Sequence, residues 1–547
     1  MSVAMLAARA VGPSLVVALA LAACSSLPPG SDYPHAVSTS FDRPAETRIG
    51  RSILDTASQH PGVSGFHVIA SGADGFVTRM EMIRSAERSL DLQYYIFHGD
   101  DTGRLLTGAI LQAADRGVRV RVLIDDGETQ EGDEQIDTLA AHPMVEIRIF
   151  NPFAYRGHWR PIRGVEFAFE SARLDYRMHN KLLVADGAAA LVGGRNIADE
   201  YFQMNPEGQF ADDDVFAAGP VVGDLAAHFD DYWNNTLSIP VLGLSGTRPT
   251  RSDLDAYRQK LREERHEARQ EDTDQMKKVE TGEPFASLVS GRMPLVWARA
   301  QVVCDSPDKK KVEQGAMAGN LMRREVVTAA RQTQSEFLMV TPYLVPGEGG
   351  LQLLKDLRAR NVRVRVLTNS LASSPELLAQ AAYTHYRLPM LQAGIELNEL
   401  RPKPGNARGS GQPAAIMRYG NYSLHAKLFV FDRSRVFIGS MNFDERSMHL
   451  NTEIGLLIDS PEIAQEIANR FDAMTDLANV YRPELRLPQP IGPGTKPDAA
   501  IDSAAARIVW HTRNQGVDVE MTTEPARDAW QRLRARFLAL FPADPEL

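Results

Sequence analysis

The chain reads HNKLLVADGAAALVGGRN over residues 179–196 and HAKLFVFDRSRVFIGSMN over residues 425–442. Both stretches fit the pattern His-x-Lys-x4-Asp-x6-Gly-x2-Asn at every fixed position. A histidine with a lysine two positions later supplies a nucleophile or proton carrier beside a cation. Because each half of the chain carries one copy, we expect a single composite site to which both halves contribute.

Each motif predicts two strands joined by a turn. On a strand, residues two apart project from the same face, so His179 and Lys181 point together, as do His425 and Lys427. The apolar run after each lysine fits a strand buried on both faces, and a second run returns the chain toward the His-Lys end. The expected strands are residues 182–184, 190–192, 428–431 and 436–438, with turns at Asp186 and Asp432.

The order of elements before each motif also repeats. Segments with helical spacing of apolar residues alternate with short β-branched runs, which is typical of an α/β lobe. The first half is expected to form helix 80–86, strand 89–97, helix 103–116 and strand 118–124, and the second half helix 325–332, strand 337–344, helix 351–360 and strand 362–367. The predicted fold class is therefore α/β, with two similar lobes.

The N-terminus predicts an exported lipoprotein. Arg9 precedes an apolar run at residues 11–20, which is too short to span a membrane stably. The run ends in Leu21-Ala22-Ala23-Cys24, and small residues that stop at a cysteine resemble a bacterial lipoprotein box. In that interpretation Cys24 is lipidated and begins the mature chain. The alternative is an ordinary signal peptide followed by a chance cysteine.

Composition divides the 547 residues into six segments. Residues 251–280 carry dense charge of both signs, which favours a linker or solvated helix, and the Pro- and Gly-rich residues 487–497 favour a linker. The predicted segments are a signal peptide at 1–23, a tether at 24–50, a first lobe at 51–240, a charged linker or helix at 241–300, a second lobe at 301–482, and an appendage at 483–547 with strands near 507–511 and 517–521 and a helix at 526–540.

The net charge of −10 weighs against a nucleic-acid partner, since nucleic-acid-binding proteins usually carry a basic face. A local basic cluster nevertheless precedes the first motif, and it contains Arg156, His158, Arg160 and Arg163 together with Trp159. This cluster could hold an anionic head group or press on a membrane interface, and a solvated loop is the alternative.

Besides Cys24 the chain has one cysteine, Cys304, so acylation of Cys24 leaves no pair for an internal disulfide and too few thiols for a zinc site. We expect Cys304 to be a buried small residue. Tyr94 and Tyr95 are expected to be strand core rather than ligand contacts.

The paired residues suit phosphodiester chemistry. Lys181 and Lys427 can neutralise charge that develops on the phosphate, so no metal or cofactor is expected. One imidazole attacks phosphorus, and the other protonates the leaving alcohol and then activates an acceptor hydroxyl. Water as the acceptor gives hydrolysis, whereas a lipid alcohol gives transfer.

Further donors to the phosphate are expected where each returning strand ends. Glycine at position 194 lets the backbone approach a phosphate closely. The amides of Asn196 and Asn442 and the hydroxyl of Ser440 can donate to its oxygens, and a helix expected to start near Asn442 would aim free N–H groups at the anion. Because Gly194 stands where the second copy has Ser440, a backbone N–H has to substitute for the hydroxyl in the first copy.

A nucleophilic histidine needs a carboxylate that fixes its tautomer and raises its basicity. Glu453 and Asp212 lie at comparable places downstream of the two motifs, each before an apolar run, and we predict them to be the orienting pair. Asp213 and Asp214 remain open as alternatives to Asp212.

The doubled motif resembles the phospholipase D superfamily, and its surroundings resemble the bacterial cardiolipin synthase branch of that superfamily. The resemblance extends over roughly residues 50 to 547, and a doubled motif of this length has a low false-positive risk. The segments that carry it are residues 177–181, 193–197 with 199–202, 439–444 with 446–447, 451–453, and Glu524-Pro525.

The resemblance implies two α/β lobes with the active site at their pseudo-twofold interface. It implies that His179 is the nucleophile and that His425 is the general acid and base. It also implies mainly structural roles for Asp186 and Asp432, which we keep among the candidate catalytic residues below the His, Lys and Asn residues.

The expected function is a lipid-anchored phosphatidyltransferase that makes cardiolipin on the periplasmic side of a bacterial envelope, with Ser25 after the lipidated cysteine favouring the outer membrane. The expected donor is phosphatidylglycerol or phosphatidylethanolamine, and the acceptor is a phosphatidylglycerol hydroxyl. The alternatives are a hydrolytic phospholipase D, an extracytoplasmic nuclease, and a non-catalytic lipid-binding protein. The sequence indicates no particular protein partner.

Overall fold

The computed structural model describes residues 27–127, 133–157, 160–205, 208–245, 248–270, 287, 294–403, 421–486 and 507–541. The predicted signal peptide, Cys24 and the linker predicted at residues 487–497 lie outside these residues. Within the described ranges, no helix combines the length and the apolar character needed to cross a bilayer.

Each half of the chain builds an eight-stranded mixed sheet in which three neighbouring strands are parallel. The hydrogen-bonded order in the first half is β1 (Ser64–Ile69), β8 (Asp214–Ala218), β6 (Ala189–Gly193), β5 (Leu182–Ala185), β2 (Ser89–Tyr94), β3 (Arg119–Asp125), β4 (Val145–Phe150) and β9 (Ser238–Pro240). The order in the second half is β10 (Val296–Cys304), β19 (Ile454–Asp459), β17 (Arg435–Gly439), β16 (Leu428–Phe431), β11 (Glu336–Val340), β13 (Arg363–Asn369), β14 (Glu396–Leu400) and β20 (Val480–Arg486). The two orders correspond strand for strand.

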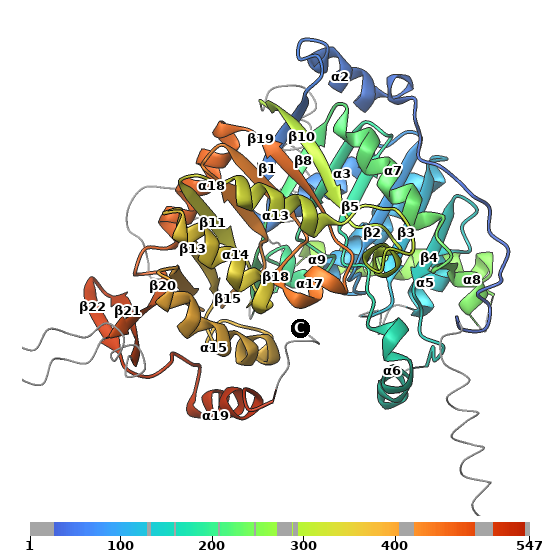
Figure 1. Ribbon diagram of the computed structural model, residues 1–547. Helices are drawn as coiled ribbons and strands as arrows, with labels where there is room; N and C mark the ends of the chain where they lie inside the picture. The colour runs from blue at the N-terminus through green and yellow to red at the C-terminus, as the bar shows by residue number, and fades with distance from the viewer. Residues whose placement is uncertain are drawn as a thin grey trace, which may run out of the picture.

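The two sheets join edge to edge. β1 pairs antiparallel with β10, with Phe66 opposite Val296 and Ser64 opposite Ala298, so the strands form one continuous sheet (Figure 1). Because the strand order is the same on both sides of this junction, the halves are related by a pseudo-twofold axis through it. At the far edge of the second half, β20 pairs antiparallel with β21 (Arg507–Asn514), which pairs antiparallel with β22 (Val517–Met521).

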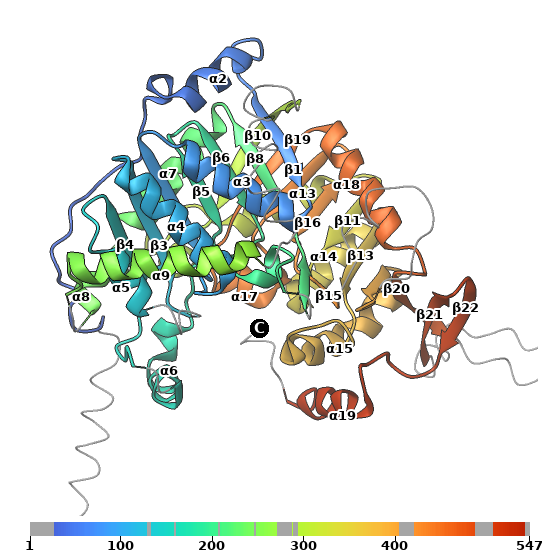
Figure 2. The same ribbon diagram turned by 180° about the vertical axis from the view of Figure 1, so that it is seen from behind.

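Helices cover both faces of this sheet (Figures 1 and 2). The α7 and α18 helices share one hydrophobic core that takes side chains from both halves, for example Phe229 and Phe471. The helices of the first half are η1 (Pro44–Glu46), α2 (Arg48–Ala57), α3 (Gly72–Ser85), α4 (Asp101–Asp115), α5 (Asp133–Leu139), α6 (Arg160–Leu174), η2 (Asp199–Tyr201), α7 (Val221–Trp233), α8 (Val241–Leu244) and α9 (Arg251–Gln270). Those of the second half are α12 (Lys309–Glu313), α13 (Met322–Gln332), α14 (Gly347–Ala359), α15 (Leu377–Gln392), α17 (Glu445–His449), α18 (Pro461–Met474) and α19 (Ala529–Leu538).

Two short parallel pairings cross from one half to the other. β7 (Gln209–Ala211) pairs with β15 (Tyr422–Leu424), and an isolated bridge joins Met178 to Thr452. Two other short pairings stay within one half: β12 (Leu344–Val345) with β18 (Phe443–Asp444) in the second, and the bridge between Phe97 and Ile197 in the first. The crossing pairings bring the two motifs to the same place.

Asp186 and Asp432 close the turns of the β5–β6 and β16–β17 hairpins. The Asp186 carboxylate accepts hydrogen bonds of 2.7–3.2 Å from the three consecutive backbone N–H groups of residues 87–89. Asp432 does the same for residues 334–336, at 2.7–3.1 Å. Both aspartates stand at the end of their strand remote from the His-Lys pair. The structure therefore corrects their inclusion among the candidate catalytic residues, because they cap backbone donors instead.

Several predicted boundaries differ from the structure by a few residues. The predicted start of the second lobe, residue 301, falls inside β10, and the strand predicted to reach residue 97 ends at Tyr94. Cys304 is a buried free cysteine, and burial raises the pKa of its thiol to about 12. The thiol is therefore protonated and unreactive at neutral pH.

Candidate active site

The crossing pairings decide which residues face one another. A parallel pairing continues in register, so the residues that follow the paired ones on the two strands lie side by side. His179 follows Met178 and Glu453 follows Thr452, and the His179 N–H donates to the Thr452 carbonyl at 2.9 Å. The first histidine is thereby placed next to a carboxylate of the second half.

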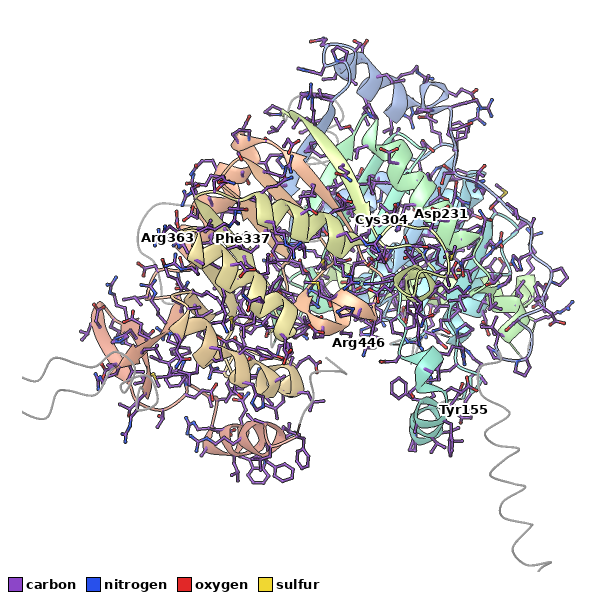
Figure 3. All side chains as sticks on the ribbon, in the orientation of Figure 1. Tyr155, Asp231, Cys304, Phe337, Arg363 and Arg446 are labelled. Carbon is purple, nitrogen blue, oxygen red and sulfur yellow. The ribbon has the colours of Figure 1, made fainter. Side chains whose placement is uncertain are left out.

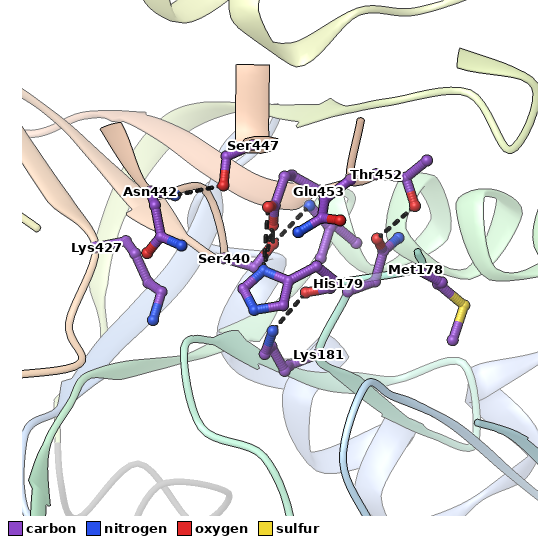
Figure 4. Close-up of polar contacts among 12 residues, drawn as sticks. Met178, His179, Lys181, Lys427, Ser440, Asn442, Ser447, Thr452 and Glu453 are labelled. Atoms are coloured by element: carbon purple, nitrogen blue, oxygen red, sulfur yellow. Dashed lines mark hydrogen bonds and ion pairs between the residues drawn. The ribbon is translucent and has the colours of Figure 1, made fainter. Parts of the chain in front are cut away.

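Glu453 holds the ring of His179 through the nitrogen Nδ1 (Figure 4). The distances from Nδ1 to Oε2 and Oε1 are 2.9 and 3.0 Å. When Nδ1–H donates to a carboxylate, the lone pair of the neutral imidazole resides on Nε2. Nε2 of His179 is therefore the atom able to attack phosphorus.

The second histidine has the mirror arrangement. His425 follows the end of β15, and its N–H donates to the Ala211 carbonyl at 2.8 Å. Asp212 follows β7, and its Oδ2 lies 2.6 Å from Nδ1 of His425. The structure thus brings both predicted carboxylates to the histidines, and it does so crosswise, since each histidine is oriented by the other half. Of the two alternatives to Asp212, Asp213 pairs with Arg470 at 2.6 Å.

Asp214 is also occupied away from both histidines. Its Oδ2 accepts from Arg79 at 2.8 Å and from Arg195 at 3.0 Å, and all three side chains are buried. Neither alternative carboxylate therefore contacts a histidine ring.

Both lysines are buried next to the rings. Lys181 Nζ donates to the His179 carbonyl at 2.6 Å and lies 5.5 Å from the centre of the Tyr95 ring. Lys427 Nζ lies 2.8 Å from Nδ1 and 3.1 Å from Nε2 of His425. The charge of Lys427 acts on Lys181, and the charges of both lysines act on both rings. Two buried ammonium groups beside the histidines form a strong site for a phosphate.

Burial and nearby charges displace the pKa values of both histidines and both lysines. Burial, followed by the charges of Lys181 and Lys427, lowers the pKa of His179 well below its ordinary value, and burial followed by the same two lysines lowers the pKa of His425. Burial lowers the pKa of Lys181 well below that of an exposed lysine and that of Lys427 to about 8. Both histidines are therefore neutral at pH 7 before an anion enters.

Glu453 titrates in the opposite direction. Burial raises its pKa to about 7, against the opposing effects of Lys181 and the Ser440 hydroxyl. The Ser440 hydroxyl donates to Oε2 of Glu453 and accepts from the backbone N–H of Ile454 at 3.0 Å. Both hydrogen-bonding capacities of Ser440 are thus used within the protein, which corrects its predicted contact with the phosphate.

Gly194 occupies the matching position in the first half and is also not a phosphate ligand. A Cβ at this position would lie 2.1 Å from Oδ1 of Asp212, so only glycine fits against the carboxylate. The donor that replaces the missing hydroxyl is the Asp213 N–H, at 2.8 Å from the same oxygen. The prediction that a backbone N–H substitutes is therefore right in kind, but its acceptor is Asp212 and not the substrate.

The two motif asparagines differ in the same way. In Asn196, Oδ1 accepts from the Ile96 N–H at 3.2 Å and Nδ2 donates to the Tyr201 hydroxyl at 2.9 Å, so both ends of the amide make a bond within the first half. Among the described residues, no hydrogen bond engages the side chain of Asn442, whose buried Oδ1 has no partner. Asn442 lies beside Lys427 in Figure 4, and its amide is available to a phosphate.

The helix expected to start near Asn442 starts three residues later. The five-residue α17 begins at Glu445, and the Asp444 carboxylate caps its backbone donor at Ser447 with a bond of 2.7 Å. Burial raises the pKa of Asp444 to about 7. This helix end is occupied by a side chain, so it does not supply the predicted free N–H groups.

Sequence reasoning missed three contributors to the site. Tyr95 was expected to be core, yet its ring meets that of His179 edge-on at 5.1 Å. The Tyr201 hydroxyl lies 3.5 Å from Nε2 of His425. Asp305 accepts from the Glu453 N–H at 3.1 Å and from Lys309 Nζ at 3.0 Å. Tyr95 and Asp305 are distant along the chain from both motifs and no spacing marks them, whereas Tyr201 follows the first motif by five residues and lies in the segment 199–202 that carries the family resemblance.

Two other predictions concern ions. Among the described residues, no group of three or more His, Cys, Asp or Glu side chains is arranged to hold a metal ion. In the predicted basic cluster, Arg156 and Arg163 contact the Asp126 carboxylate at 2.5 and 3.1 Å, while His158 and Trp159 lie outside the described residues. The two arginines share this one carboxylate, which balances one of their two positive charges.

Comparison with known proteins places the chain in a family. Residues 80–233 and 326–475 match the family described as cardiolipin synthase, PLD-like domain. The chain is 34% identical over 507 residues to cardiolipin synthase C of Escherichia coli, a match that covers 91% of this chain and 99% of the relative. It is 26% identical to cardiolipin synthase A of Pseudomonas syringae, over 75% of this chain and 68% of that protein. A solved phosphatidylserine synthase of Haemophilus influenzae aligns over 77% of this chain and 90% of its own, with a TM-score of 0.48 and 14% identity.

Proposed function

The chain belongs to the phospholipase D-like cardiolipin synthase family, and on that premise we propose that it makes cardiolipin by phosphatidyl transfer through a phosphohistidine at His179. It is an enzyme of the phospholipid phosphatidyltransferase kind. The observation that carries the proposal is the crossed arrangement of two His–carboxylate pairs around two buried lysines. One such pair suffices to orient a base, whereas two facing pairs allow one ring to attack phosphorus and the other to act as general acid and base.

In the first half-reaction the donor phosphodiester lies between Lys181 and Lys427. Nε2 of His179 attacks phosphorus, a P–N bond forms, and the bond from phosphorus to the head-group oxygen breaks. The leaving oxygen takes its proton from His425. Glycerol leaves when phosphatidylglycerol is the donor, and ethanolamine leaves when phosphatidylethanolamine is the donor.

Substrate binding prepares His425 for this role. Lys427 and Lys181 are, after burial, the groups that lower the pKa of His425, and a bound phosphate anion cancels their field. The pKa of His425 then rises toward the operating pH, and the ring gains the proton that it later gives to the leaving alcohol. The same anion stabilises both lysines as ammonium ions.

In the second half-reaction a phosphatidylglycerol hydroxyl gives its proton to His425, and its oxygen attacks phosphorus. The P–N bond breaks, and cardiolipin and free His179 are formed. The Tyr201 hydroxyl, 3.5 Å from Nε2 of His425, lies where it can hold the acceptor hydroxyl in line. Water at the same place would give phosphatidic acid, so the acceptor alone separates synthase from hydrolase.

The test is product analysis with defined liposomes. Purified protein is given phosphatidylglycerol, phosphatidylethanolamine, or both, and the lipids are separated by mass. Cardiolipin is expected, with phosphatidic acid a minor product. Phosphatidic acid alone would overturn the synthase proposal in favour of hydrolysis. A phosphoryl group trapped on His179 by acid-free denaturation, and lost in His179→Ala, would support the proposed intermediate, whereas a label trapped on His425 would reverse the two roles.

We also propose that the chain is a lipoprotein of the bacterial envelope, anchored through Cys24 and facing the periplasm, with the outer membrane favoured. The support is the sequence at residues 11–25. Cell fractionation of Cys24→Ser tests this, because loss of the acyl chain is expected to release the protein. Retention in the membrane fraction would mean that the apolar segment itself anchors the chain.

A further inference from the structure

The α6 helix exposes apolar side chains while charged ones tie it to the body. Ile162, Val165 and Phe169 recur at helical spacing on its exposed surface, and Phe169 is 71% accessible. The groups that hold α6 in place are polar: Glu166 accepts the N–H of Tyr155 at 3.0 Å, and Arg173 donates to the Pro152 carbonyl at 2.8 Å. A surface helix of a soluble protein has the reverse arrangement, with the apolar stripe inward.

The α19 helix has the same inverted arrangement. Its exposed stripe consists of Trp530, Leu533 and Phe537 and continues past the helix end to Leu540, 77% accessible, and Phe541. The opposite side is small or polar and contacts the segment after β13. Gln531 donates to the Leu371 carbonyl at 2.8 Å and Arg527 to the Ala372 carbonyl at 2.7 Å. Figure 3 shows the outer side chains of α19 directed away from the body.

Both helices are attached beside the histidines. α6 ends at Leu174, five positions before His179, and the Asn151 amide after β4 donates to the Tyr176 carbonyl in the connecting segment at 2.8 Å. The segment that α19 contacts follows Asn369, whose Oδ1 accepts from the Leu424 N–H at 2.8 Å, one residue before His425. Each helix therefore stands at the carboxyl-terminal edge of the parallel strands of one half, which is the edge that carries the site.

The two exposed stripes lie on one side of the molecule. In both Figure 1 and Figure 2, α6 and α19 project from the same side of the body, with α17 between them. α17 carries Arg446, which joins the second half to Asp175 just after α6 with a bond of 2.6 Å. The side of the protein from which the histidines are approached is thus flanked by apolar residues from both halves.

Charge distinguishes a lipid surface from a protein partner. Residues 527–541 contain four arginines, at 527, 532, 534 and 536, and one acidic residue, Asp528, in a chain whose net charge is −10. Arg534 and Arg536 are exposed beside the apolar stripe. An apolar stripe with arginines at its border is the pattern of a helix that lies in the interface of an anionic bilayer.

We propose that α6 and α19 are a pair of membrane-docking helices, which insert their exposed apolar side chains into a bilayer that contains anionic phospholipid and hold the site against it. The inference rests on the proposed function in that the substrate is a bilayer lipid. Two attachment points, one from each half, fix the orientation of the site, which a single N-terminal lipid anchor does not.

The test places a polarity-sensitive fluorophore on each helix of the full-length chain. Cysteine is introduced at Phe169→Cys or Leu533→Cys in a Cys24→Ser background, in which the native Cys304 is buried. When vesicles of phosphatidylglycerol and phosphatidylethanolamine are added, the fluorescence emission of both probes is expected to shift to the blue. Nitroxide-labelled lipids in the vesicles are expected to quench it. The control probe at Val517→Cys on β22, 64% exposed, is expected to stay unchanged. If the emission of the helix probes changes no more than that of the control, the proposal is overturned. That is the result expected if the stripes bind a protein and not a bilayer.

A second experiment separates docking from chemistry. Phe169→Gln with Leu533→Gln is expected to reduce turnover on vesicles roughly tenfold or more, since burying each large apolar side chain contributes the equivalent of about one power of ten. Turnover of the same lipid in detergent micelles is expected to be unchanged, as is that of Val517→Gln in both systems. An equal loss in micelles would contradict the docking role. His179→Ala, which is expected to lose turnover, should still give the membrane response of the probes, so that failure of the proposed function and failure of docking are told apart.

Discussion

Replacing Glu453 by glutamine tests the crossed orientation of the nucleophile, and we expect turnover to fall by about one to four orders of magnitude. The lower bound comes from the lost hydrogen bond between Nδ1 of His179 and the carboxylate, at 2.9 Å. A hydrogen bond to a charged group contributes about 1.5–3 kcal/mol, which corresponds to a factor of roughly 10 to 150. The upper bound comes from the tautomer. A glutamine amide that donates to Nδ1 forces the proton onto Nε2 and removes the attacking lone pair, and the equivalent change in a serine protease triad costs about 10⁴.

The same substitution has a pH signature. Glu453 is the main group that opposes the burial-induced fall of the Lys181 pKa, and it opposes that of the Lys427 pKa after Asp212, so its neutralisation lowers both pKa values further. An ammonium group acts below its pKa and is lost as pH rises through it. The alkaline limb of the activity profile is therefore expected to move to lower pH in Glu453→Gln, which a purely steric defect would not produce.

The assay is the initial rate of cardiolipin formation from defined vesicles, measured over neutral and alkaline pH. Ser440→Ala is the matched control, because it removes one donor to Glu453 and keeps the carboxylate, and its expected loss is about tenfold. Thermal unfolding of each variant shows whether the fold is kept. A Glu453→Gln protein that is folded and retains more than about a third of the wild-type rate would refute the orienting role.

Three further outcomes follow from the geometry. Gly194→Ser should abolish turnover, because its Cβ would collide with Oδ1 of Asp212 at 2.1 Å, and a rate near wild type would contradict the tight fit. Asp186→Ala should lower the free energy of unfolding by about 1–3 kcal/mol, and by more than Asp432→Ala does, because Asp186 is fully buried. Turnover per folded molecule should change little, and a large loss of turnover would return these residues to the catalytic set. Turnover should decline as pH rises through about 8, where Lys427 loses its proton. Lys427→Arg should extend activity to higher pH, and an alkaline limb at the same pH in this variant would exclude Lys427 as the group whose deprotonation causes the decline.

The local pattern predicted most of the site because the decisive spacings are short. His179 and Lys181 share a strand face whatever the rest of the fold does, and the same holds for the second copy. Strand 118–124 was placed within one residue of β3, since a β-branched run between two helical segments is an unambiguous signal. The two halves could therefore be drawn separately from the sequence.

The sequence does not show which carboxylate of one half contacts which histidine of the other. The partners His179 and Glu453 are 274 positions apart, and their contact depends on the parallel bridge between Met178 and Thr452. No periodicity encodes that bridge. For the same reason Ser440 was assigned to the phosphate, because its spacing shows a hydroxyl near the site but not that the carboxylate of Glu453 accepts from it.

The crossed pairing explains why the motif is present twice in one chain. Each half supplies a histidine and a lysine but withholds from itself the carboxylate that orients its own histidine, so an isolated half has a misaligned ring and an unpaired buried acid. A buried carboxylate without its partner is costly, and the interface between the halves therefore stabilises the fold and assembles the site by the same contacts. The two halves then diverge where their tasks differ. Asp212 is met by glycine and a backbone N–H, and Glu453 by the Ser440 hydroxyl, so the two rings stand in different electrostatic surroundings. We propose that this difference lets one histidine act as the nucleophile and the other as the acid and base, although both come from the same pattern of residues.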